Sequence, residues 1–206
     1  MPTISTTKPN RTGYTFKGWY DNTAWNASGA KQYYTDAGAS ARTWDKTSDA
    51  TLYAGWQANT TTVSFNSNNA TGTTGIQTAT VTATFDSNMP AISTTKPTRT
   101  GWIFQGWYDN ADYSAGTQYY TDAGASARTW NKDVASATLY AGWKAAEITI
   151  RWYGLPNDAK IDGVSANVNA DHIGTSKVSY DGNIVTPDKA IVTQGGQTFL
   201  GWKFLK

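Results

Sequence analysis

Residue types that usually carry enzyme chemistry are scarce in this sequence of 206 residues. His172 is the only histidine and cysteine is absent, so a multi-histidine metal site cannot form, and disulfides and thiolate metal ligands are excluded. The histidine lies in the polar stretch 169–174, which is typical of a surface loop. We therefore expect no enzymatic activity and no cofactor.

Carboxylates raise two further possibilities, glycoside hydrolysis and calcium binding. The Asp-Asn pairs at 21–22 and 109–110 each follow a Trp-Tyr pair directly, a pattern typical of turns and not of paired catalytic carboxylates. A calcium loop of the type D-x-[DN]-x-[DN]-G does not occur, and Asp158 and Asp162 alone are too few ligands. We expect neither a catalytic site nor a metal site.

An internal repeat dominates the sequence. Residues 1–9, MPTISTTKP, recur as MPAISTTKP at 89–97, and TLYAGW at 51–56 recurs at 138–143. The offset of roughly 87 residues is too long for a solenoid repeat and fits a small domain with its own core. Residues 60–88 have no counterpart in the first copy. We expect a first repeat with only the C-terminal part, a complete second repeat, and a divergent third repeat or cap with the N-terminal part, at 1–58, 59–145 and 146–206.

Alternation of apolar and polar residues predicts β-strands. Val63 and Phe65 show it, as do Leu52, Ala54 and Trp56, and clusters of Thr, Asn and Gly between such segments predict turns. The expected fold class is mostly β, built as tandem small domains. Each unit holds at most one short helix, over 33–44 in the first repeat.

Aromatic side chains are expected to form the cores, since Trp and Tyr number 10 and 12 in the chain. They recur in the motif G-[YW]-x-F-x-G-W-Y followed by T-L-Y-A-G-W, whose glycine between Phe and Trp predicts a bulge or a close approach of an indole to the backbone. The motif positions are Tyr14, Phe16, Gly18, Trp19, Leu52 and Trp56 in the first repeat, and Trp102, Phe104, Gly106, Trp107, Leu139 and Trp143 in the second.

Exposed aromatic rings would also suit carbohydrate binding, because sugars stack on flat aromatic faces. Trp25 and its aligned counterpart Tyr113 lie outside the core motif, in the variable loop after the Asp-Asn turn. They are therefore the candidate ligand-binding residues, whereas the motif tryptophans are expected in the core.

The aromatic motif resembles the Listeria–Bacteroides repeat, the internalin B repeat family. The similarity rests on PTRTGWIFQGWY at 97–108 with TLYAGW at 138–143, and on the equivalent segments from Pro9 to Trp56. This resemblance implies compact β-grasp-like modules in tandem on secreted and surface proteins of bacteria, acting as spacer, stalk or adhesive segment. It implies no catalysis.

Charge and hydropathy restrict the partners. The net charge is +2 and no run of five Lys or Arg occurs, so nucleic acid is not expected as a partner, and no apolar stretch is long enough for insertion into a membrane. We expect an extracellular cell-surface segment whose signal and anchor lie outside this chain. Its partner would be a protein or glycan on a host or neighbouring cell, or a second copy, because the partial repeats at 1–58 and 146–206 could complete one another by strand complementation, within one chain or between chains.

Overall fold

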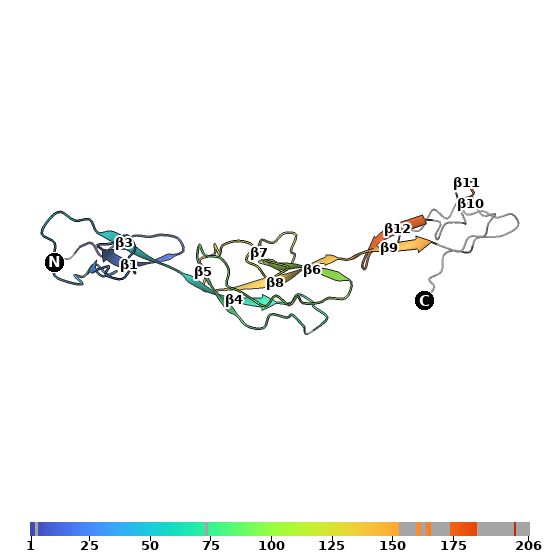
Figure 1. The fold of residues 1–206 in the computed structure, drawn as a ribbon, viewed down its shortest axis with the longest axis horizontal. Coiled ribbons are helices and arrows are strands. Elements are labelled where there is room, and N and C mark those ends of the chain that lie inside the picture. Colours follow the sequence, from blue (N-terminus) through green and yellow to red (C-terminus); the bar gives the residue numbers. More distant parts are fainter. Residues whose placement is uncertain are drawn as a thin grey trace. The chain divides into compact units, whose positions relative to one another are not determined.

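A computed structural model of the chain describes residues 1–2, 4–72, 74–152, 160–161, 164–165, 174–184 and 200. These residues form strands and turns (Figure 1), which confirms the predicted mostly β fold class. The chain divides into two compact units, one with residues 1–98 and 104–142 and the other with residues 99–103 and 143–206. His172, Asp158, Asp162 and the segment 185–199 lie outside the described residues.

The first repeat contains a three-stranded antiparallel sheet. Strand β1 (Tyr14–Tyr20) lies in the middle, with β2 (Gln32–Tyr34) on one side and β3 (Tyr53–Ala58) on the other. The register between β1 and β3 shifts at Gly18, whose φ of +115° is readily adopted only by glycine. A Cβ there would lie 2.2 Å from the carbonyl oxygen of Tyr34, so this glycine lets β2 approach closely.

The second repeat contains a five-stranded sheet in the order β5-β4-β8-β6-β7. Strands β6, β7 and β8 correspond to β1, β2 and β3 of the first repeat. Strand β4 pairs with β8 in parallel and with β5 in antiparallel orientation, so β4 is the inner strand of the part that the first repeat does not have. The bounds are β4 (Thr60–Asn66), β5 (Val81–Thr84), β6 (Trp102–Tyr108), β7 (Gln118–Thr121) and β8 (Ser136–Ala145).

The described part of the third repeat begins with β9 (Glu147–Trp152), which pairs in antiparallel orientation with β12 (Gly174–Ser179). This pair corresponds to β4 and β5. Two short strands, β10 (Lys160–Ile161) and β11 (Val164–Ser165), pair with each other.

The expected short helix over 33–44 is not formed, and the described residues contain no helix. Tyr33 and Tyr34 are both buried on strand β2, which adds to the edge of β1. A turn follows directly, closed by a hydrogen bond from the Thr35 amide to the Ala39 carbonyl and passing through Gly38 at a φ of +80°. Edge pairing of the two tyrosines therefore prevails over the weak helical pattern.

The core of the second repeat is aromatic and is closed by β4. The ring of Phe65 on β4 lies 4.9 Å from that of Trp107 and 5.9 Å from that of Tyr120. Trp130, which is fully buried, donates its indole N–H to the Thr61 hydroxyl at 2.9 Å. Of the motif positions, the second repeat buries Phe104, Gly106, Trp107, Leu139 and Trp143 and leaves Trp102 half-buried, whereas the first buries Phe16 and Gly18 and leaves Tyr14, Trp19, Leu52 and Trp56 half-buried.

Candidate functional site

The connection between repeats is the most distinctive local structure of the chain. Strand β3 ends at Ala58 and β4 begins at Thr60, so one residue, Asn59, separates the closing strand of the first repeat from the opening strand of the second. In the same way Ala146 alone separates β8 from β9. Each repeat therefore passes into the next along one nearly continuous extended segment.

The first joint is defined by Gly13, Asn59 and Phe85. The amide of Asn59 donates to the Gly13 carbonyl at 2.8 Å, and the amide of Phe85 donates to the Asn59 carbonyl at 2.9 Å. Gly13 has a φ of +78°, and a Cβ at this position would lie 2.2 Å from the Phe85 ring. The edge-on contact of Phe85 with Tyr14, with ring centroids 5.7 Å apart, completes the packing. An aromatic residue of the second repeat thus covers a glycine of the first.

The second joint repeats this arrangement with Gly101, Ala146 and Tyr180. The amide of Ala146 donates to the Gly101 carbonyl at 2.9 Å, and the amide of Tyr180 donates to the Ala146 carbonyl at 2.8 Å. Gly101 also has a φ of +78°, and a Cβ there would lie 2.1 Å from the Tyr180 ring. Tyr180 contacts Trp102 with an interplanar angle of 67°. The two joints therefore use equivalent residues in equivalent roles.

An arginine contacts the motif aromatic ring at each joint. The guanidinium of Arg11 lies 3.7 Å from the centroid of the Tyr14 ring, and that of Arg99 lies 4.1 Å from the Trp102 ring. The sequence carries this as R-T-G-[YW] at 11–14 and 99–102. The glycine was visible in the repeated motif, but its partner, the aromatic residue directly after the second strand of the next repeat, lies far away in sequence.

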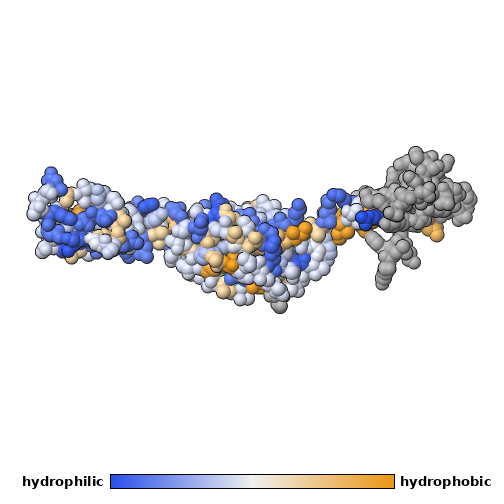
Figure 2. Space-filling view, viewed as in Figure 1, coloured by the Kyte–Doolittle hydropathy of each residue, from blue (hydrophilic) through white to orange (hydrophobic). Residues whose placement is uncertain are grey.

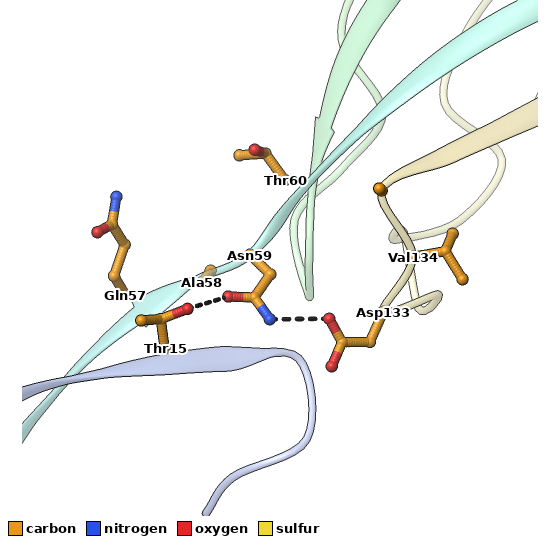
Figure 3. Close-up of a pocket in the computed structure, with 8 residues that line it drawn as sticks. Thr15, Gln57, Ala58, Asn59, Thr60, Asp133 and Val134 are labelled. Atoms are coloured by element: carbon orange, nitrogen blue, oxygen red, sulfur yellow. Dashed lines mark hydrogen bonds between the residues drawn. The ribbon is translucent and has the colours of Figure 1, made fainter.

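Polar side chains add to the first joint around a shallow cavity of about 450 Å³ (Figure 3). The Thr15 hydroxyl donates to the Asn59 side-chain oxygen at 2.6 Å, and the Asn59 amide group donates to Asp133 at 2.8 Å. Asp133 also accepts the backbone N–H of Gly13 at 3.0 Å. The carboxylate is thus engaged in structural hydrogen bonds across the joint, which favours a positioning role over acid-base chemistry.

The predicted ligand-binding residues Trp25 and Tyr113 are half-buried at equivalent places. Trp25 donates its indole N–H to the Trp56 carbonyl at 2.8 Å, and its ring packs on that of Tyr20 with centroids 5.7 Å apart. Tyr113 packs on Tyr108 at 5.6 Å in an edge-on contact. Each side chain lies over a glycine of the closing strand, Gly55 or Gly142, and so has a packing role as well as an exposed part.

Several charged groups of the first two repeats form ion pairs at equivalent positions. Lys46 with Asp21 and Lys132 with Asp109 are equivalent ion pairs of 2.7 and 2.8 Å. The hydrogen bond from Lys46 is the main cause that lowers the pKa of Asp21. Among the described residues no three His, Cys, Asp or Glu side chains gather where they could hold a metal ion.

One position differs between the repeats in a way that matters for charge. Asp45 accepts a hydrogen bond from the Tyr33 hydroxyl and another from Lys31, and these lower its pKa from 3.8 to about 2. The equivalent residue of the second repeat is Asn131, which accepts from the Tyr119 hydroxyl at 2.7 Å. The residue that accepts the tyrosine hydrogen bond is therefore ionisable in the first repeat and neutral in the second.

The face seen in Figure 2 has no broad apolar area over the first two repeats. On the side seen in Figure 2, polar colours prevail over the first and second repeats and apolar colour forms small separate patches. In the part of the chain that the structure describes, no helix is long and apolar enough to cross a membrane.

Two relatives from Evansella cellulosilytica match the chain. One, provisionally named a membrane protein, is 28% identical over 95% of this chain and 23% of its own length. The other, provisionally named a Gly-rich membrane protein, is 28% identical over 77% of this chain and 15% of its own length. The chain thus spans less than a quarter of either relative.

No solved structure matches the chain. The model of one protein family, the Listeria-Bacteroides repeat domain, matches residues 2–55 and 62–142, which together make up most of the chain. Both matched segments contain the aromatic motif whose glycine, Gly13 or Gly101, forms the joint. The chain therefore belongs to the Listeria-Bacteroides repeat domain family.

Proposed function

We propose that this chain is a non-catalytic spacer or stalk segment of a bacterial cell-surface or secreted protein. The observation that carries the proposal is the joint, which is built twice from equivalent residues with a linker of one residue. A flexible polar linker would leave neighbouring domains free to reorient. Here a linker of one residue, a ring packed on a glycine and two backbone hydrogen bonds restrict that freedom.

Surface localisation is supported by the family and by the names of the two relatives. Because the chain spans less than a quarter of either relative, an adhesive tip or an anchor would belong to other parts of such a protein. The β-grasp-like description belongs to the proposal too. It is supported by the order β5-β4-β8-β6-β7, in which the first and last strands of the second repeat lie side by side in parallel.

A distance measurement between the first two repeats tests the spacer proposal. Cysteines introduced at Thr23 and Ala111, which are exposed and equivalent, would carry spin labels, and the natural absence of cysteine keeps the labelling specific. Electron spin resonance should give one narrow distance distribution. A broad distribution, like that of two domains on a flexible tether, would refute the spacer role while leaving the folds of the repeats intact.

Carbohydrate binding remains the alternative proposal. It is supported by the partly exposed rings of Trp25 and Tyr113, which recur at equivalent places and would present the same small surface on successive repeats. Quenching of tryptophan fluorescence by a panel of bacterial and host polysaccharides tests it. The Trp25→Ala variant should lose the response, and the absence of any response in the unaltered chain would rule the alternative out.

A further inference from the structure

The first repeat has an apolar groove where the second repeat has a strand. In the second repeat β4 lies beside β8, with Val63 opposite Ala137 and Phe65 opposite Leu139. This strand covers Trp130, which has an exposed fraction of 0%. The equivalent residue of the first repeat, Trp44, is 45% exposed. The tryptophan at this position of the repeat is therefore buried only where a β4-type strand covers it.

The groove itself has a volume of about 530 Å³ and an apolar lining. Its position corresponds to that of Val63 and Phe65 in the second repeat, because Phe65 packs on Tyr120, the equivalent of the lining residue Tyr34. The backbone supports this correspondence: residues 136–139 belong to β8, whereas the equivalent residues 49–52 are not in a strand. The lining residues are Met1, Pro2, Tyr34, Thr43, Trp44, Ala50 and Leu52.

The third repeat presents a strand of the matching kind. Strand β9 pairs with β12 as β4 pairs with β5, and Ile148 and Ile150 occupy the places of Thr61 and Val63. Thr61 is 2% exposed, whereas Ile148 is 47% exposed. An apolar side chain on an extended strand is thus exposed at a position that is buried in the complete repeat.

We propose that the groove of the first repeat binds strand β9 of a second copy of this chain, in parallel with residues 49–52, so that chains associate head to tail. The register follows β4 and β8, with Ile150 beside Ala50. The composite sheet would then have the strand order of the second repeat. Because the two surfaces differ, the association does not close on itself as a symmetric dimer and can continue into a filament. This inference does not depend on the spacer function.

Disulfide trapping of the full chain tests the register directly. Neighbouring strands place facing Cα atoms within the range of about 4.4–6.8 Å that a disulfide allows. Two single variants, Ala50→Cys and Ile150→Cys, are mixed and oxidised; a crosslinked heterodimer is expected in large excess over the product of Ala50→Cys mixed with Lys177→Cys. Lys177 lies exposed on β12, away from the proposed pairing edge of β9.

Two further variants test whether the crosslink depends on Ile148 and whether chains associate head to tail. Adding Ile148→Lys to the Ile150→Cys chain should reduce the crosslink to the control level, because the lysine would lie against Trp44 as Thr61 lies against Trp130. Circular dichroism would verify that the exposed substitution leaves the fold intact. The double variant Ala50→Cys with Ile150→Cys should give a ladder of multimers. A crosslink no greater than the control, or a double variant that oxidises only to a closed monomer, would overturn the proposal.

Discussion

Replacing Gly13 with alanine is the most direct test of how the joint is held. A φ of +78° costs an L-residue about 1–2 kcal/mol relative to glycine. The added Cβ would also lie 2.2 Å from the Phe85 ring, so the ring must move. Its edge-on contact with Tyr14, of a type that contributes about 0.5–1.5 kcal/mol, would then be lost. We expect Gly13→Ala to lower the free energy of unfolding by about 2–3 kcal/mol.

Gly29 provides a matched control for the backbone part of this effect. Its φ is +87°, and a Cβ there would have no heavy atom within 4 Å. Gly29→Ala should therefore cost only the backbone term of about 1–2 kcal/mol. The difference between the two variants, about 1 kcal/mol, measures the contact between Gly13 and the Phe85 ring.

Urea unfolding followed by tryptophan fluorescence gives both free energies. In the background of Phe85→Ala the two glycine variants should become equally destabilising, because the ring that distinguishes them is gone. If Gly13→Ala is no worse than Gly29→Ala with Phe85 present, and the spin-label distribution between the first two repeats does not broaden, then the ring contact does not hold the joint and our reasoning is refuted.

Three further predictions follow from particular contacts. Trp130→Phe should lower the free energy of unfolding by about 2–4 kcal/mol in thermal or urea unfolding, since it removes a buried hydrogen bond and leaves a cavity. Trp44→Phe, the control, should cost less than about 1 kcal/mol because that ring is exposed. The folded-state pKa of Asp45 is depressed from 3.8 to about 2, so its stabilisation is present above 3.8 and lost as pH falls through about 2. Asp45→Asn should reduce the dependence of the melting temperature on pH over that range. An unchanged pH profile would contradict this. Asn59→Ala should broaden the spin-label distribution between the first two repeats, because it removes both bridging hydrogen bonds.

The mostly β fold could be anticipated because β-strands leave a local pattern in the sequence. Alternation at Val63 and Phe65 predicts a strand, and both residues do lie on β4. The helix expected over 33–44 was wrong because burial of Tyr33 and Tyr34 on an edge strand depends on β1, which the local sequence does not reveal.

The joint could not be predicted from a single repeat. Gly13 and Gly101 stand in the repeated motif, but the motif does not show that Phe85 or Tyr180 lies over them. Those two aromatic residues differ in type and stand in otherwise dissimilar segments, so their equivalence is visible only from the shared position directly after β5 and β12. Pairing across repeats is a long-range property, which composition and periodicity do not contain.

The division of the joint between neighbours gives the array a direction. Each joint takes R-T-G-[YW] from one repeat and an aromatic ring from the repeat that follows, so in both joints a β4-type hairpin follows the closing strand. Contacts of this kind involve nearest neighbours alone, and stability then depends on each repeat and each interface separately. Gly13, Asn59 and Phe85 hold the first repeat to the sheet that Trp130 supports. A first repeat weakened at Gly13 should therefore unfold before the second. A substitution of Trp130 should instead weaken both the second repeat and its joint with the first.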